Sequence, residues 1–239
     1  MRILVTNDDG INAKGIIELA RMAARLGEVT VVAPAEQCSA MSQRLTILTS
    51  LDVHKVDFPV HVQAAYVVNG FPADCVRVAR SALLDFKPDI CFSGINAGYN
   101  SGFDNAYSGT LGAAMEAVMS GIPAIAFSTS FDSDYDTVDR YLYDVARELA
   151  ETPIAGNQVF NVNFPDCPAS ACKGVLMDVP VAQFSYYENF YTPSVNTDGS
   201  IHYTITPKQN FTGSLEGTDI GGILDGYVTI SRIKNMIMD

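Results

Sequence analysis

The sequence predicts an α/β fold, a doubly wound and mostly parallel sheet, with a C-terminal extension rich in β-hairpins. Two observations predict it. Up to about residue 165, short apolar runs alternate with segments whose apolar residues recur at helical spacing. Beyond that point prolines separate aromatic and β-branched stretches, and helical periodicity is lost. The chain has 239 residues, 48% of them hydrophobic, which is enough for a sizeable core.

The first strand–helix–strand unit is predicted from residues 3–33. Residues 3–6 form an apolar run, and residues 29–33 form a second run that is closed by Pro34. Parallel pairing of the two runs, with a helix as the crossover, is the economical interpretation. The segment between them repeats its apolar residues at helical spacing, at Ile16, Leu19, Ala20 and Ala23.

The same alternation continues to residue 164. Two of its helices carry end signals, because Pro72 stands in the first turn of one and Gly121 follows the end of another. Residues 46–69 carry several strand-like pieces. The other predicted elements are, in order, a helix over 73–84, a strand over 89–93, a helix over 111–118, a strand over 124–128, a helix over 138–151 and a strand over 159–164.

We expect a single domain over residues 1–239, because no linker is long enough to separate two. Residues 1–165 are expected to form the α/β core with the active site. Residues 166–239 are expected to form a β-rich extension and C-terminal tail, with strand-like stretches at 184–191 and 201–205. Exposed aromatic residues in this extension predict a surface for self-association.

Charge and composition exclude several classes of function. The net charge is −12 and no basic cluster offsets it, so a nucleic acid polymer is not an expected partner. No apolar run approaches a membrane span, and acids at positions 8 and 9 interrupt the first run, so we expect a cytoplasmic protein with no membrane partner. The five cysteines are odd in number and irregularly spaced, which suits a reducing compartment.

Two adjacent acids, Asp8 and Asp9, follow the first predicted strand. This is the carboxyl end of a parallel strand, where ligands bind in open α/β sheets. Adjacent carboxylates repel each other unless a cation or a proton lies between them, and one hard metal could bind both. The alternative is that one acid caps the next helix and the other faces water.

Two further loops are expected at the same edge of the sheet. Asn96 follows the strand at 89–93, and its amide oxygen is an acceptable ligand for Mg²⁺ or Mn²⁺; alternatively it is a turn residue between glycines. Ser108, Gly109 and Thr110 open a helix whose free N–H groups and hydroxyls could bind phosphate. The alternative for this segment is an ordinary helix cap.

These pieces together resemble the SurE (survival protein E) family of 5′-nucleotidases, over nearly the whole chain. The matching stretches are ILVTNDDG at 3–10 with GI at 15–16, VVAP at 31–34, SAMS at 39–42 with LT at 45–46, PADCV at 72–76, PD at 88–89, SGINAG at 93–98, YSGT at 107–110, AAME at 113–116, GIP at 121–123, TD at 218–219 and GYV at 226–228. The resemblance implies a Rossmann-like sheet. Phe71 and Cys38 depart from residues common in the family, and we expect them to affect substrate preference.

The resemblance implies a site for one divalent metal ion per subunit, Mg²⁺ or Mn²⁺. Its implied metal ligands are Asp8, Asp9, Ser39 and Asn96. Asp8, Asp9 and Asn96 would be catalytic, and Ser39 and the loop Ser108-Gly109-Thr110 would bind substrate. The three histidines, His54, His61 and His202, lie in no matching loop and are expected to be structural or exposed.

The implied reaction is hydrolysis of nucleoside 5′-monophosphates to nucleoside and phosphate, with 3′-nucleotides and short polyphosphate as further candidate substrates. Water activated by the metal would attack phosphorus in line, with Asp8 orienting or deprotonating it; in the alternative, Asp8 attacks and forms an aspartyl-phosphate. The resemblance also implies a homodimer or homotetramer through the extension, with residues 218–239 exchanged between subunits.

Two other classes of protein also place acids or ligands at such a sheet edge. A phospho-receiver signalling module binds magnesium there, but it is about half this length and leaves Asn96 and Ser108 without a role. A dinucleotide-binding enzyme needs a glycine fingerprint after the first strand, and Asn7-Asp8-Asp9-Gly10 is not one.

Cys167 and Cys172 lack a second cysteine pair or a nearby histidine, which argues against a zinc site.

Overall fold

The computed structural model describes residues 1–209, 215–236 and 238 of the chain. At its centre lies a nine-stranded sheet with the strand order β3-β4-β2-β1-β5-β6-β7-β11-β8. These strands are β1 (Arg2–Thr6), β2 (Glu28–Pro34), β3 (Val53–Lys55), β4 (Ala64–Val68), β5 (Ile90–Ala97), β6 (Ala124–Thr129), β7 (Gln158–Phe164), β8 (Val175–Leu176) and β11 (Val228–Lys234).

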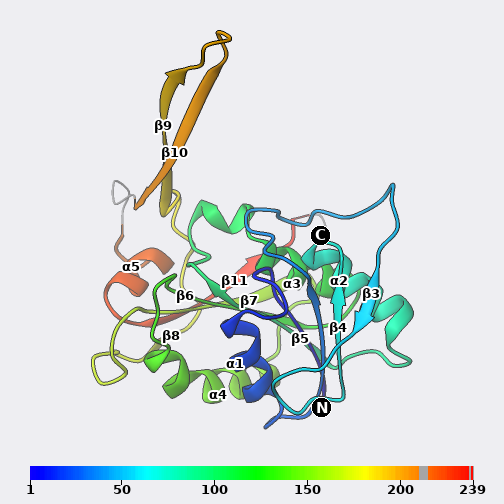
Figure 1. The fold of residues 1–239 in the computed structure, drawn as a ribbon. Coiled ribbons are helices and arrows are strands. Elements are labelled where there is room, and N and C mark those ends of the chain that lie inside the picture. The colour runs from blue at the N-terminus through cyan, green and yellow to red at the C-terminus, as the bar shows by residue number, and fades with distance from the viewer. Residues whose placement is uncertain (210–214, 237, 239) are drawn as a thin grey trace.

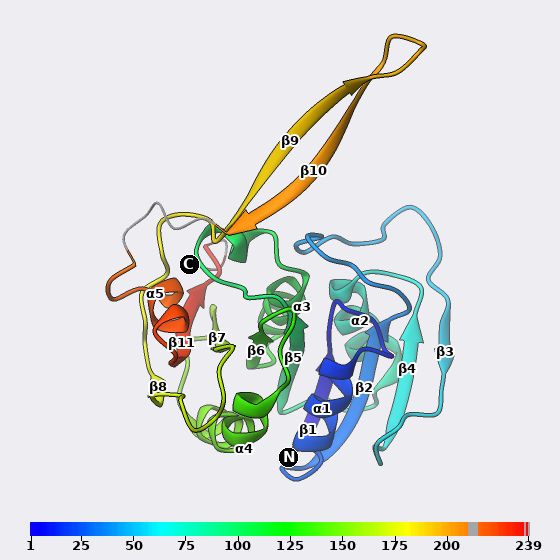
Figure 2. The same cartoon turned by 60° about the vertical axis from the view of Figure 1, so that its left-hand side comes forward.

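Helices cover both faces of this sheet, as Figure 2 shows. Helices α1 (Lys14–Ala23) and α4 (Asp136–Glu151) bury their apolar residues in one core, and α2 (Pro72–Val78) and α3 (Gly109–Met119) bury theirs in a second core on the other face. All neighbouring strands from β4 to β7 are parallel. The predicted doubly wound, mostly parallel α/β fold is therefore confirmed.

The order of the strands reverses beside β1. The chain runs outward from β1 through β2 to β4, and then returns to the other side of β1 with β5. Ligands bind at such a switch point in open α/β sheets, in the crevice outside the carboxyl ends of the strands. The crevice between β1 and β5 is therefore the expected place for a site in this fold.

In the α/β core, two elements differ by more than two residues from their predicted extents. Strand β5 runs on to Ala97, beyond the predicted end at residue 93, and its pairing with β6 shifts register between Ser93 and Asn96. The helix predicted over 73–84 ends as α2 at Val78 and continues as a π-helical turn, η1 (Ala79–Leu83). Asn96 is thus a strand residue next to a bulge rather than a loop residue.

The C-terminal region is only partly separate from the core. Strands β9 (Tyr187–Val195) and β10 (Ile201–Gln209) pair with each other and project away from the body of the molecule (Figure 1). Strands β8 and β11, however, join the edge of the main sheet, and helix α5 (Asp219–Leu224) precedes β11. A short 3₁₀ helix, η2 (Phe103–Ala106), lies before α3. Within the described residues no helix is long and apolar enough to cross a membrane.

Candidate active site

Four segments meet at the switch point of the sheet. Asp8 and Asp9 follow β1, Asn96 lies near the end of β5, residues 37–39 belong to the loop after β2, and Ser108 precedes α3. The Cys38 N–H donates a hydrogen bond to the main-chain oxygen of Asp8 at 2.7 Å, which ties the β2 loop to the end of β1. The fold therefore brings the predicted site segments to one edge of the sheet.

Asp8 is a buried carboxylate with a specific partner. Its side chain Oδ1 accepts a hydrogen bond from the Thr110 hydroxyl at 2.6 Å. Burial raises the pKa of Asp8 from 3.8 to about 7; the Thr110 hydrogen bond lowers it, and the charge of Asp9 raises it further. Without a compensating cation, this carboxyl group therefore keeps a proton up to neutral pH.

Asp9 connects the ends of two neighbouring strands. Its Oδ2 accepts a hydrogen bond from the Ala97 N–H at 2.9 Å, and its Oδ1 lies 3.4 Å from the Gln37 side-chain nitrogen. Burial raises the pKa of Asp9, while both of these donors lower it. Helix α1 has Ala13 at its N-cap with no side-chain hydrogen bond, so neither acid caps that helix.

Asn96 and Ser39 complete the predicted ligand set. The amide nitrogen of Asn96 donates a hydrogen bond to the Gly98 main-chain oxygen at 2.7 Å, which fixes the orientation of the amide and leaves its oxygen as an acceptor. Ser39 is exposed and directly follows Cys38, the residue that is tied to Asp8. The half-buried Asn96 side chain and the exposed hydroxyl of Ser39 are both neutral oxygen donors.

The N-terminus of α3 packs against Asp8. The Ser108 hydroxyl accepts a hydrogen bond from the Leu111 N–H at 3.0 Å, so this side chain is an ordinary helix cap. A Cβ atom placed on Gly109 would lie 2.9 Å from Asp8 Oδ2 and 3.2 Å from the Cys38 main-chain oxygen. The Gly109 N–H makes no hydrogen bond to any described residue. The Thr110 hydroxyl already donates to Asp8, so what this helix end offers an anion is its main-chain N–H groups and the proton of the Ser108 hydroxyl.

Sequence reasoning missed three contributors to the site. Gln37 and the main chain of Cys38 contact the acid pair, and both lie in the same loop as Ser39. Tyr187 comes from the distant β9, and its hydroxyl lies 3.8 Å from the Cβ position of Gly98. Burial raises the pKa of Tyr187 to about 12. Its approach to the site depends on tertiary packing, which no spacing along the sequence indicates.

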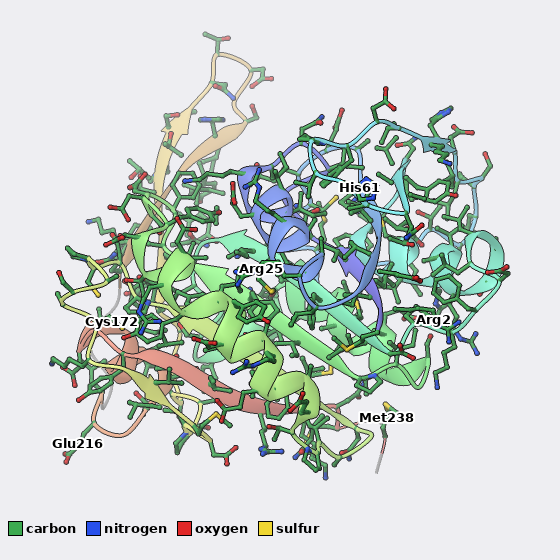
Figure 3. The ribbon with its side chains drawn as sticks, turned by 90° about the horizontal axis from the view of Figure 1, so that it is seen from below. Arg2, Arg25, His61, Cys172, Glu216 and Met238 are labelled. Carbon is green, nitrogen blue, oxygen red and sulfur yellow. The ribbon has the colours of Figure 1, made fainter. Side chains whose placement is uncertain are left out.

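The donor set suits a hard divalent cation. Two carboxylates and two neutral oxygens are ligand types that Mg²⁺ and Mn²⁺ prefer. Within the part of the chain that the structure describes, no three His, Cys, Asp or Glu side chains gather to hold a metal. All three histidines are exposed, and Figure 3 shows His61 on the opposite side of the molecule from Cys172.

Comparisons with known proteins agree with this architecture. The family model "Survival protein SurE" matches residues 3–186. The chain is 36% identical to a 5′-nucleotidase SurE of Neisseria gonorrhoeae, covering 98% of this chain and 92% of the relative. It is also 36% identical to a 5′/3′-nucleotidase SurE of Shigella dysenteriae, covering 98% of this chain and 90% of the relative.

A solved structure gives the same result for the fold. The crystal structure of the SurE protein from Aquifex aeolicus superposes with a TM-score of 0.83 at 31% sequence identity, covering 98% of this chain and 93% of the other. The match therefore extends over the β9–β10 region as well as the core. With the family model matched over residues 3–186 and full-length relatives above 30% identity, the chain belongs to the SurE family.

Proposed function

We propose that this protein is a metal-dependent phosphomonoesterase that hydrolyses nucleoside 5′-monophosphates to nucleoside and phosphate. The observation that carries the proposal is the acid pair at the switch point of the sheet, in which the buried Asp8 packs against the N-terminus of α3 and the half-buried Asp9 lies beside it. Relatives named 5′-nucleotidase at 36% identity over nearly the full length support the reaction class. The relative named 5′/3′-nucleotidase makes 3′-nucleotides a second candidate substrate, and short polyphosphate is a third.

The proposed metal site consists of Asp8, Asp9, Ser39 and Asn96, and holds one Mg²⁺ or Mn²⁺ per subunit. The raised pKa values of both carboxyl groups support it, because a cation bound between them would stabilise the charged forms that burial disfavours. A divalent cation bound there supplies Lewis-acid chemistry, which polarises a phosphoryl oxygen and makes water more acidic. The donor set lacks sulfur and imidazole, which favours magnesium or manganese over zinc.

The roles of the protein's own groups follow from their contacts. Thr110 holds one oxygen of Asp8, which leaves Oδ2 to orient or deprotonate the attacking water. Gly109 offers its N–H to the phosphoryl oxygens, where charge develops during the reaction. Attack by Asp8 itself, with an aspartyl-phosphate intermediate, is the alternative route. Rapid-quench trapping of a phosphorylated protein would favour this second route.

We further propose that the ribbon formed by β9 and β10 joins copies of this chain into a homodimer or homotetramer. Paired residues of the two strands share a face, and one face of the ribbon is apolar with side chains 52% to 74% exposed. A two-stranded ribbon is marginally stable alone, so a partner surface would stabilise it. The apolar face consists of Tyr191, Val195, Ile201, Tyr203 and Ile205.

Phosphate release from a panel of substrates tests the proposed reaction. The panel contains nucleoside 5′- and 3′-monophosphates, short polyphosphate and p-nitrophenyl phosphate, each assayed with Mg²⁺, with Mn²⁺ and with chelator. We expect release that depends on metal and is fastest with a nucleoside 5′-monophosphate. Absence of release with either metal would reject the proposal.

The five free cysteines support a reducing compartment such as the cytoplasm as the place of action.

A further inference from the structure

A pocket of about 700 Å³ opens beside the acid pair. Two residues of its wall belong to the site already described. Cys38 donates its N–H to the Asp8 main-chain oxygen at 2.7 Å, and Gln37 lies 3.4 Å from Asp9 Oδ1. The pocket therefore shares Gln37 and Cys38 with the site, and it lies beside a phosphate bound at the acid pair. Its volume is typical of small-molecule sites.

The pocket contains a guanidinium group that lies over an aromatic ring. The Arg44 guanidinium lies 4.2 Å from the centroid of the Phe71 ring, and both residues line the pocket. A guanidinium is planar and has two faces, so a group stacked on one face leaves the other for a further ring. Ile47 and Leu48, also in the wall, are 78% and 92% exposed and add apolar surface at the mouth.

The buried carboxylate of Asp74 anchors the main chain at Phe71 and the loop that carries Arg44. Asp74 accepts hydrogen bonds from the Thr46 N–H at 3.0 Å, the Thr46 hydroxyl at 2.8 Å and the Phe71 N–H at 3.0 Å. Thr46 follows Arg44 by two residues, so the loop carrying the guanidinium and the residue carrying the ring share an anchor. Loops anchored in this way before a ligand arrives lose little conformational entropy on binding.

We propose that this pocket binds the nucleobase of the substrate, with the base stacked on the guanidinium of the Arg44–Phe71 pair. The proposal rests on the proposed function, because it extends the same site from the phosphate to the base. Arginine planes and aromatic rings are the common stacking partners of unpaired bases in proteins. A purine covers more of the guanidinium than a pyrimidine does, so purine nucleotides are the preferred class.

The test compares a substrate that carries a base with one that does not. The kcat/KM for AMP is divided by that for ribose 5-phosphate, in the wild-type protein and in the Arg44→Lys and Phe71→Leu variants. Lysine keeps the charge but has no plane to stack on. We expect this ratio to fall about tenfold in both variants, through a higher KM for AMP, because stacking contributes roughly 1–3 kcal/mol per base.

A matched control lies at the start of β1, at the amino ends of the parallel strands. The Arg2 guanidinium lies 4.6 Å from the centroid of the Phe86 ring, outside the pocket, so Phe86→Leu removes the same kind of stack. We expect the ratio to stay unchanged in this variant. An unchanged ratio in Arg44→Lys and Phe71→Leu, or an equal loss on both substrates, would overturn the proposal.

Binding of adenosine separates this proposal from the proposed reaction. Adenosine has no phosphate, so its contact with the pocket does not depend on hydrolysis. Saturation-transfer NMR should show transfer to the base protons in the wild-type protein and lose it in Phe71→Leu. Transfer that is absent from the wild type, or equal in the variant, would reject the base pocket. A wild-type protein that binds adenosine but hydrolyses no phosphate ester would instead reject the reaction and keep the pocket.

Discussion

At the scale of single residues, burial and contacts with neighbouring residues set the pKa of Asp8. Its carboxyl group is buried, lies two residues beyond the end of β1, accepts a hydrogen bond from Thr110 and is closely approached by Gly109. Burial gives this group a pKa of about 7, so its charge depends on pH and on a bound cation in the physiological range. The proposed metal is therefore linked to the protonation of this one residue.

The stability gained from added Mg²⁺ should increase with pH. Because the pKa of Asp8 is about 7 in the folded protein and 3.8 when unperturbed, the contribution of Asp8 to the stability of the metal-free fold is fully present below about pH 4 and is lost as pH rises through 7. The loss is at most about 1.4 kcal/mol per pH unit. Thermal unfolding with Mg²⁺ and with chelator should differ more at pH 8 than at pH 5. An equal difference at both pH values would contradict this linkage.

Replacement of Gly109 by alanine should impair the reaction more than the fold. The added methyl would lie 2.9 Å from both Cβ and Oδ2 of Asp8, so the carboxylate must shift. We expect kcat to fall by about tenfold or more, since displacements near 1 Å have large effects on catalysis. Gly156→Ala is the matched control, because nothing lies within 4 Å of its Cβ position. Similar rates in the two variants would show that the close approach is unimportant.

Sequence alone locates most of the candidate site but not its internal contacts. Asp8, Asp9, Asn96 and the 108–110 loop could be predicted because strand ends of a parallel sheet share one edge. The Thr110–Asp8 hydrogen bond joins residues 102 positions apart, and the approach of Tyr187 depends on the fold of the C-terminal region. Such contacts are set by packing between elements, which local pattern does not encode.

At the scale of elements, the first turn of α1 sets the position of β5. A Cβ atom on Gly15 would lie 1.9 Å from the Ile95 main-chain oxygen, so helix and strand approach too closely for any side chain there. Asn96 and Ala97 follow at once, and Ala97 donates to Asp9. The geometry of the site therefore depends on a helix–strand contact made by a residue outside it.

Gly15→Ala should destabilise the protein strongly. The methyl group cannot avoid a backbone oxygen, so α1 and β5 must move apart, and buried overpacking of this kind costs about 3 kcal/mol or more. Urea unfolding measures the change, with wild-type protein as the reference. A change below about 1 kcal/mol would indicate that the two elements adjust without strain.

The elements that were predicted well are those with strong local patterns. Helices α1 and α4 have one buried apolar face, and β1 and β2 are nearly continuous apolar runs. The extension of β5 to Ala97 could not be predicted, because Gly94 and Gly98 are typical of a loop, whereas in the structure the strand continues past a register shift. The membership of β11 in the main sheet was also missed, since a single short strand gives no sign of its partner.

At the scale of the whole molecule, the most prominent feature is the ribbon of β9 and β10, which stands clear of the body in Figures 1 and 2. Its base contacts the site, because the Tyr187 N–H donates to Asp104 at 2.9 Å and its hydroxyl approaches Gly98. Self-association through the ribbon would thus act on a segment that is connected to the candidate active site.

A charge on the apolar face of the ribbon should reduce the oligomer. Ile205 is paired with Tyr191 on this face, whereas its neighbour Thr204 is paired with Thr192 on the opposite face. Ile205→Lys would bury an unpaired charge in the proposed interface and should lower the mass measured by light scattering. Thr204→Lys should leave the mass unchanged. Equal masses for wild type and both variants would exclude the apolar face as the interface.

In the proposed function, the acid pair after β1 carries metal-dependent phosphate-ester hydrolysis. Its most direct test is the rate of AMP hydrolysis with saturating Mn²⁺ in wild type, Asp8→Asn and the exposed control Asp57→Asn. We predict that Asp8→Asn lowers kcat by about a thousandfold or more while remaining folded, and that Asp57→Asn matches wild type. Hydrolysis by Asp8→Asn within a few fold of the wild-type rate would contradict the account.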